Sequence, residues 1–172
     1  MAGPTESETC RELILPALRA AGWSDEQIIE EYPITDGRII PMGQRHRRDR
    51  PLRADYVLEV DGVPVTLVEA KRTRRNTADG VTQAKQYGRL LELPMVYASN
   101  GRETRSIDLV EGREEYNASF PSPEEAWARF EAANGLTPST SRAFTEPFNR
   151  TLRLFDGRAK TPRYYQRIAI NR

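Results

Sequence analysis

Residues 53–71 read RADYVLEVDGVPVTLVEAK, and this stretch determines the expected fold. Two runs rich in β-branched residues flank Asp61-Gly62, a dipeptide that is typical of a tight hairpin turn. Apolar residues occupy both faces of each run, as expected for central strands that are covered on both sides. One face is expected to carry Val57, Val65 and Leu67, and the other Tyr56, Leu58 and Val68. The stretch therefore predicts a β-hairpin in the interior of a sheet.

Patterns outside the hairpin predict helices and further strands around it. The expected helices cover about 5–21, 24–32, 79–91, 122–135 and 161–172, and the expected strands cover 35–40, 95–99 and 104–110. Pro16 should kink or split the first helix, because its ring crowds the carbonyl of Glu12. The basic segment QRHRRDRPLR, at 44–53, is expected to be a loop. This order of elements predicts an α/β fold, a three-layer mixed sheet with flanking helices.

Length and composition limit the function. The chain has 172 residues and a formal net charge of +1, so one domain is expected and the overall charge does not indicate a polyanionic partner. Its one cysteine, Cys10, and one histidine, His46, exclude an intrachain disulfide and zinc sites built from several such ligands. Cys10 is expected to be a small buried residue of the first helix. Without a long apolar run or a signal-like amino terminus, the sequence predicts a cytoplasmic protein that does not enter a membrane.

The chemistry depends on whether Asp55 and Glu69 share a face of the hairpin. Glu69 and Lys71 are two residues apart, so these two share a face in any register. A two-residue loop with unbroken pairing would set Asp55 opposite Val68, on the face away from Glu69. A three-residue loop from Val60 to Gly62 would instead make Asp55 a same-face diagonal neighbour of Glu69, with Cα atoms about 7–8 Å apart. A bulge of the same effect would also bring the two acids to one face.

Two carboxylates and a lysine at the end of a hairpin suit phosphodiester hydrolysis with Mg²⁺. Asp55 and Glu69 would hold this cation through oxygen, and the ion would polarise a phosphoryl oxygen and acidify a water molecule. Lys71, beside two acids, should stay protonated and would orient water and stabilise the charge that develops on the phosphate. A D…ExK pattern also arises by chance, and the alternative interpretation is an ordinary surface salt bridge.

Two basic runs bracket these acids in the sequence, where the phosphates of a nucleic acid would dock. Their arginines include Arg47 and Arg48 before the first acid, and Arg74 and Arg75 after the second. The alternative for each run is a solvated loop. On the following helix, Gln83 and Tyr87 lie four residues apart and share a face.

Together these motifs resemble the amino-terminal nuclease domain of the restriction (R) subunit of type I restriction-modification enzymes, part of the PD-(D/E)xK nuclease superfamily. The resemblance rests on ADYVL at 54–58, LVEAK at 67–71 and DGVTQAKQYGRLLELPMVYASNG at 79–101. It extends to SETCRELILPALRAAGW at 7–23, ITDGRIIPMG at 34–43 and FPSPEEAW at 120–127. TPRYYQRIAINR, at 161–172, resembles the motif that introduces the family's DNA-translocating motor.

The resemblance implies a restriction-endonuclease-like fold and a role for each residue of the motifs. The implied roles are Mg²⁺ binding for Asp55 and Glu69, catalysis for Lys71, and support of the site as a QxxxY pair for Gln83 and Tyr87. An acid of the first helix often assists in this superfamily, and Glu8 is the nearest candidate, with Glu6 and Glu12 as alternatives. Ala54 stands where the superfamily motif has proline. No GxxxxGK[ST] occurs, so ATP would be bound only by a motor region that this chain lacks.

The function implied by the resemblance is Mg²⁺-dependent cleavage of double-stranded DNA, as part of a type I site-specific deoxyribonuclease and without sequence preference of its own. The implied partners are DNA and the modification and specificity subunits of the restriction complex. The expected domains are a nuclease domain over 1–135, a linker over 136–160 and the start of a motor region over 161–172. Two alternatives stay open: a non-cleaving DNA- or subunit-docking module with the same fold, and a repair or recombination nuclease.

Overall fold

The computed structural model describes residues 5–35, 39–42, 45–48, 51–71, 77–138 and 140–141. In this part of the chain, a six-stranded sheet runs in the order β1-β4-β5-β6-β7-β8, and β2 pairs with β3 in a separate ribbon. The strands of the large sheet are β1 (Ile28–Thr35), β4 (Leu52–Val60), β5 (Val63–Ala70), β6 (Met95–Ser99), β7 (Thr104–Asp108) and β8 (Glu114–Tyr116). Its strands pair antiparallel except β5 and β6, which are parallel and joined by α3 (Ala78–Leu90).

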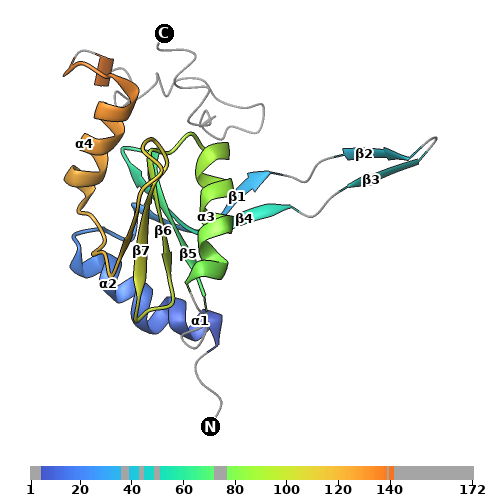
Figure 1. Ribbon diagram of the computed structural model, residues 1–172, viewed down its shortest axis with the longest axis horizontal. Helices are drawn as coiled ribbons and strands as arrows, with labels where there is room; N and C mark the ends of the chain where they lie inside the picture. The colour runs from blue at the N-terminus through green and yellow to red at the C-terminus, as the bar shows by residue number, and fades with distance from the viewer. Residues whose placement is uncertain are drawn as a thin grey trace, which may run out of the picture.

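Helices cover both faces of the sheet, which confirms the three-layer α/β prediction (Figure 1). The helical elements of one face are α1 (Glu6–Thr9), η1 (Cys10–Ile14), α2 (Leu15–Ala20) and α4 (Pro123–Asn134). They pack against a core that includes Tyr56 and Val68. On the other face α3 packs against a core that includes Val57 and Leu67. Because both faces are covered, every residue of β5 is buried, as expected for a central strand.

Pro16 splits the first predicted helix by way of a π-helical turn. In η1 the N–H of Leu15 donates to the carbonyl of Cys10, five residues back rather than four. The wider turn accommodates Pro16, which lacks an N–H and whose ring would otherwise crowd the carbonyl of Glu12. The proline is therefore placed at the start of α2, where it is tolerated.

The helix predicted over 24–32 is wrong. Ser24 to Gln27 form only a turn, in which the N–H of Gln27 donates to the carbonyl of Ser24 at 3.0 Å. The chain then enters β1, where Ile28 lies opposite Leu58 of the buried strand β4. The capping signal at Ser24 is local, and the burial of apolar residues against a central strand outweighs it.

The loop predicted over 44–53 is also wrong. Arg45–Arg48 forms β3, which pairs antiparallel with β2 (Ile39–Met42), and β4 already begins at Leu52. The strand expected over 35–40 is accordingly divided between the end of β1 and the start of β2. In Figure 1 the β2–β3 ribbon extends away from the rest of the molecule. Part of the basic run thus lies on a projecting ribbon rather than on a loop.

The second half of the chain follows the predictions more closely. β6 has the predicted bounds, α3 is shifted by one residue, and β7 ends two residues early. α4 begins with the predicted capping box of Ser122 and Glu125, and it ends at Gly135 with a φ of +60°. β8 was not predicted, because its three residues are all exposed and carry no apolar alternation. The helix predicted over 161–172 and most of the predicted linker lie outside the described residues.

Gly88 provides a test of how closely α3 packs on the sheet. A Cβ at this position would lie 2.4 Å from Cγ1 of Val96 and 2.6 Å from Cδ1 of Leu109. We expect Gly88→Ala to lower the free energy of unfolding by about 1–2 kcal/mol, because overpacking a core costs more than the gain in helix propensity returns. Chemical denaturation would measure the change, with the exposed Gln86→Ala in the same helix as a control that stays near the parent. A Gly88→Ala variant as stable as the parent would contradict this packing.

Candidate active site

The loop of the hairpin has two residues, and a bulge follows it. Asp61 (φ +50°) and Gly62 (φ +74°) form a type I′ turn that sets Val60 opposite Val63. The register then shifts, because Glu59 lies opposite Pro64 whereas Leu58 lies opposite Thr66. The predicted three-residue loop is therefore wrong, and the alternative that the prediction allowed, a bulge of the same effect, is confirmed.

This bulge brings Asp55 to the face of Glu69. Beyond it, Val57 lies opposite Leu67 and Tyr56 opposite Val68, so the next pair in the same register is Asp55 and Glu69. Continued by one residue, this register sets the two acids opposite each other rather than as diagonal neighbours. The bulge also moves Val65 to the face of Tyr56, away from the face on which it was predicted.

Asp55 bonds to the chain segment that carries the other two motif residues. Its Oδ2 accepts a hydrogen bond from the backbone N–H of Ala70 at 2.7 Å. The observed pairing of β4 with β5 ends just before this point, at Tyr56 and Val68. The Asp55 carboxylate therefore bonds to β5 just beyond the last paired residues of the two strands, and it lies next to the peptide between Glu69 and Lys71.

Glu69 is almost completely buried, with an exposed fraction of 1%, and the Nζ of Lys71 lies 3.8 Å from its Oε1. Burying a carboxylate is costly unless a cation or hydrogen bonds compensate its charge. The ammonium group supplies part of that compensation. The pair is therefore a built feature of the interior and differs from the surface salt bridge that was the alternative interpretation.

Both the main chain and the side chain of Lys71 are fixed by neighbouring elements. Its N–H donates to the carbonyl of Ser99, at the end of β6, at 2.8 Å. Its aliphatic chain lies against Gly80 in the first turn of α3, where a Cβ would be 3.2 Å from the lysine Cγ. Glycine at position 80 leaves the space that this side chain occupies.

An open cleft of about 580 Å³ lies beside Asp55. Its lining residues are Ser7, Cys10, Arg11, Leu15, Glu30, Glu31, Asp55 and Tyr56. Glu31, with a φ of +50°, falls between the pairs Glu30–Tyr56 and Tyr32–Ala54, so the register sets it opposite Asp55. Neither glutamate was predicted as a site residue, because the sequence pattern favoured a helix where β1 runs beside β4.

Glu8, the predicted accessory acid, does not line this cleft. It closes a capping box with Thr5, whose N–H donates to Glu8 Oε2 at 2.7 Å. Hydrogen bonds from the Thr5 backbone and hydroxyl lower the pKa of this exposed carboxyl. Glu12, an alternative, is exposed and ion-paired with Arg11. Cys10, expected to be buried, is half-buried and lines the cleft.

Gln83 and Tyr87 form a hydrogen-bonded pair on α3. The Nε2 of Gln83 donates to the hydroxyl oxygen of Tyr87 at 3.0 Å. Tyr87 is 5% exposed and belongs to the core between α3 and the sheet. The predicted common face is confirmed, and the pair satisfies a phenol hydroxyl at the edge of this core.

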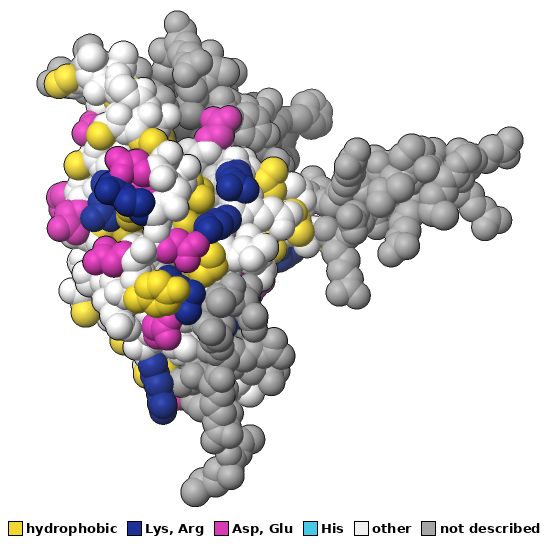
Figure 2. Space-filling model, in the orientation of Figure 1, with side chains coloured by type: hydrophobic (Ala, Val, Ile, Leu, Met, Phe, Trp, Pro, Cys, Tyr) yellow, Lys and Arg dark blue, Asp and Glu magenta, His cyan; other side chains and the backbone are white. Residues whose placement is uncertain are grey.

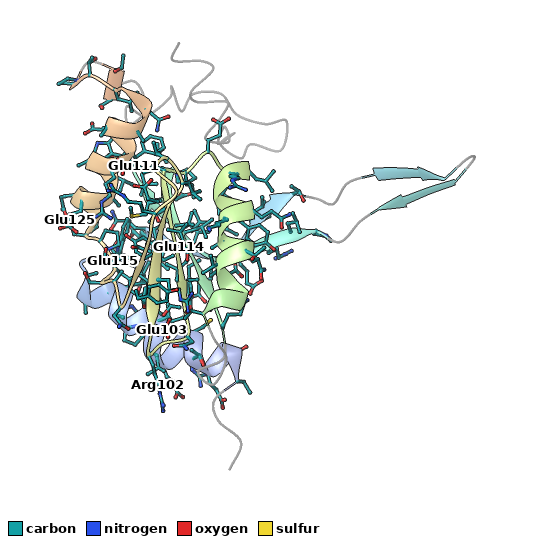
Figure 3. The ribbon with its side chains drawn as sticks, in the orientation of Figure 1. Arg102, Glu103, Glu111, Glu114, Glu115 and Glu125 are labelled. Atoms are coloured by element: carbon teal, nitrogen blue, oxygen red, sulfur yellow. The ribbon has the colours of Figure 1, made fainter. Side chains whose placement is uncertain are left out.

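The predicted basic residues are only partly covered by the structure. Arg47 and Arg48 lie in β3, and Arg74 and Arg75 lie outside the described residues. On the face drawn in Figures 2 and 3, acidic and basic side chains are interspersed, and they include the ion pair of Lys85 with Glu114. Among the described residues, no group of three or more His, Cys, Asp or Glu residues is arranged to hold a metal ion, and no helix is long and apolar enough to cross a bilayer.

Comparison with known proteins assigns the family. The family described as type I restriction enzyme R protein N terminus matches residues 25–115, just over half of the chain. The chain belongs to this family. Over 98% of its length it is 34% identical to the type I restriction enzyme EcoAI endonuclease subunit of Escherichia coli. A solved fragment described as an HsdR subunit of a type I restriction enzyme from Vibrio vulnificus matches 99% of the chain with a TM-score of 0.79 and 33% identity.

These relatives of the R-subunit family are longer proteins. The chain covers 21% of the Escherichia coli subunit and 32% of the Vibrio vulnificus fragment. The match to the solved fragment supports the restriction-endonuclease-like fold that the motifs implied.

Proposed function

We propose that this chain is the Mg²⁺-dependent endonuclease domain of a type I restriction enzyme R subunit and that it hydrolyses phosphodiester bonds of double-stranded DNA. The observation that carries the proposal is the juxtaposition of Asp55, Glu69 and Lys71 where β4 and β5 separate. These three residue types at one point can hold a hard cation and stabilise charge on a phosphate. Membership of the R-subunit family supports the assignment.

The donor set fits Mg²⁺. Asp55 and Glu69 offer carboxylate oxygens, which this ion prefers, and two carboxylates suffice because protein-bound Mg²⁺ keeps several water ligands. When bound, the ion would polarise a phosphoryl oxygen and make a coordinated water more acidic. The near-complete burial of Glu69 supports a site for a cation, since a second positive charge would offset the cost of its desolvation.

Lys71 acts as a source of positive charge in this proposal. Its ammonium lies 3.8 Å from Glu69 Oε1, and its side chain is 14% exposed, so it is largely shielded from water. In this setting a protonated lysine orients the attacking water and stabilises the charge that develops on the phosphate. The hydrogen bond from the Ala70 N–H holds the carboxylate of Asp55 beside the segment that carries Glu69 and Lys71.

Basic runs on both sides of the motif would contact the DNA backbone. Part of one run lies on the β2–β3 ribbon, which projects beyond the ends of β1 and β4 (Figure 1). Contacts to phosphate position a duplex without reading its bases, so the domain would cut without a sequence preference of its own. Choice of the DNA site would belong to the specificity subunit, which together with the modification subunit is the proposed partner.

The test is cleavage of a supercoiled plasmid, with the protein alone and together with the modification and specificity subunits of its system. We expect nicked and linear DNA with Mg²⁺, and neither product with EDTA or with Glu69→Ala. Glu115→Ala, at an exposed position of β8, is the matched control and should cut like the parent. Binding without cleavage under every condition would favour the docking module, and a preference for branched DNA or free ends would favour a repair nuclease.

A further inference from the structure

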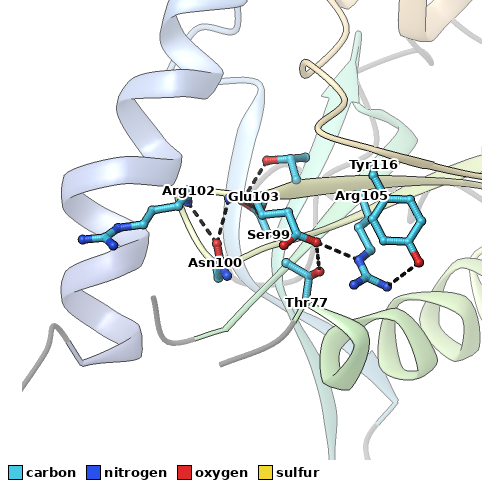
Figure 4. Close-up of polar contacts among 8 residues, drawn as sticks. Thr77, Ser99, Asn100, Arg102, Glu103, Arg105 and Tyr116 are labelled. Carbon is cyan, nitrogen blue, oxygen red and sulfur yellow. Dashed lines mark hydrogen bonds and ion pairs between the residues drawn. The ribbon is translucent and has the colours of Figure 1, made fainter. Parts of the chain in front are cut away.

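The turn between β6 and β7, with its flanking residues 99–104, contains a network of polar contacts (Figure 4). Its Ser99 accepts the backbone hydrogen bond of Lys71. Asn100 Oδ1 accepts hydrogen bonds from the N–H groups of Arg102 at 3.0 Å and Glu103 at 2.8 Å. The hydroxyl of Ser99 donates to the carbonyl of Glu103 at 3.2 Å. These bonds fix the backbone conformation of the turn at Glu103.

Glu103 links this turn to the start of α3. Its Oε1 accepts from the Thr77 hydroxyl at 2.7 Å and from Arg105 Nε at 2.9 Å. Both contacts lower the pKa of Glu103, the Thr77 bond most, so the group is charged at neutral pH. Arg105 is itself held, because its guanidinium lies 4.2 Å from the ring centroid of Tyr116 and donates to the Tyr116 hydroxyl oxygen at 3.3 Å.

Thr77 uses its hydroxyl in an unusual way for its position. It is fully buried and immediately precedes α3, where a threonine commonly caps the helix through its side-chain oxygen. Here the side chain makes no capping bond and donates to Glu103 instead. A local stabilising contact of the helix is thus replaced by a link to a residue 26 positions further along the chain.

The first turn of α3 connects Thr77 to Lys71. The N–H of Gly80 donates to the carbonyl of Thr77 at 2.9 Å. The Lys71 side chain lies on Gly80, and the Lys71 N–H is bonded to Ser99 in the same β6–β7 turn. The main chain of the lysine and the surface beneath its side chain therefore both depend on this turn.

We propose that Glu103 is a positioning residue for Lys71: through Thr77 it holds the first turn of α3 against the lysine side chain, and so sets where the ammonium lies relative to Glu69. The catalytic consequence rests on the proposed nuclease function, whereas the link itself rests on the contacts above. Glu103 contacts neither Lys71 Nζ nor Glu69 in these interactions, so it acts only through Thr77 and Gly80.

Four substitutions test this link. Thr77→Val removes the hydroxyl donor at nearly constant volume, and Thr77→Ser keeps the donor. Glu103→Ala removes the acceptor. Glu114→Ala is the matched control, because it breaks the ion pair between β8 and Lys85 of α3, away from the β6–β7 turn (Figure 3). If Thr77→Val does not fold, Thr77→Ala, which also removes the hydroxyl donor, takes its place.

The first readout does not need activity. The sequence contains three lysines, Lys71, Lys85 and Lys160, so ¹³Cε-lysine labelling gives three side-chain NMR signals that Lys→Arg variants assign. We expect Thr77→Val and Glu103→Ala to move the Lys71 signal, and Thr77→Ser to restore it. Glu114→Ala should move the Lys85 signal and leave Lys71 unchanged. An unchanged Lys71 signal in folded Thr77→Val and Glu103→Ala proteins would overturn the proposal.

The second readout is the cleavage rate at saturating DNA. We expect Thr77→Val and Glu103→Ala to lower kcat by about 10- to 100-fold with little change in KM, because a small displacement of a catalytic group costs this much. Parent-like kcat in both variants would also overturn the proposal. If the parent does not cut DNA but the Lys71 signal responds as expected, the link stands and the nuclease function fails, so the two failures are distinguishable.

Discussion

Asp55→Ala, Glu69→Ala and Lys71→Ala should each reduce Mg²⁺-dependent DNA cleavage by about 10³-fold or more, because residues that act as one unit lose most of their effect when any member is removed. The structure supports treating them as a unit. Asp55 bonds to the peptide between the other two, and Lys71 lies 3.8 Å from Glu69. For the same reason the effects should not add, and a double variant should cut no more slowly than the slower single variant.

Cleavage rates and thermal unfolding of the same preparations check this result. Each variant should unfold cooperatively, since the hairpin is held by pairing along β4 and β5 and by cores on both faces. Glu124→Ala, in the exposed part of the first turn of α4, is the control and should cut like the parent. Loss of cleavage in only one of the three variants, with the other two cutting at the parent rate, would contradict a shared site.

The hairpin shows which features of the fold could be predicted from the sequence and which could not. Its strands and turn were evident from β-branched runs around Asp61-Gly62, but the position of the bulge was not. The sequence nevertheless contained a signal for the bulge. Pro64 has no N–H to donate to a neighbouring strand, and proline within sheets is confined to edges and bulges. Reading Pro64 in this way would have placed the bulge beside the turn and set Asp55 opposite Glu69 without a longer loop.

Other parts of the site depend on contacts that no local pattern contains. Glu30 and Glu31 reach the cleft because β1 pairs with β4, whereas their own surroundings in the sequence favoured a helix. Glu103 and Thr77 are hydrogen-bonded although 26 residues separate them in the sequence. In the sequence, each is an ordinary polar residue next to a predicted element. Periodicity and capping report the conformation of a segment, and the partners of a side chain follow only from the tertiary pairing.

Replacing the arginines of the two basic runs should flatten the salt dependence of DNA binding. Each phosphate contact adds about −0.9 to the slope of log K against log salt for duplex DNA, because condensed counterions are released. If Arg47, Arg48, Arg74 and Arg75 all contact phosphate, changing the four to Gln should flatten the slope by about 3–4 units. Binding by the cleavage-deficient Lys71→Ala protein to two unrelated duplexes would measure it, and both duplexes should respond alike.

The β2–β3 ribbon makes this prediction sharper, because neighbouring residues of a strand belong to opposite faces. By this alternation, we expect Arg45 and Arg47 to belong to one face of the ribbon and Arg48 to the other. If a duplex contacts the first face, the salt slope of Arg45→Gln/Arg47→Gln should be flatter than that of the parent by about 1.8 units, and the slope of Arg48→Gln should be almost unchanged. If it contacts the second face, the salt slope of Arg48→Gln should be flatter by about 0.9 units, and that of the double variant should be almost unchanged. Parent-like slopes in both proteins would remove the ribbon from the DNA contact, and a parent-like slope in the fourfold variant would favour docking to another subunit over the binding of DNA.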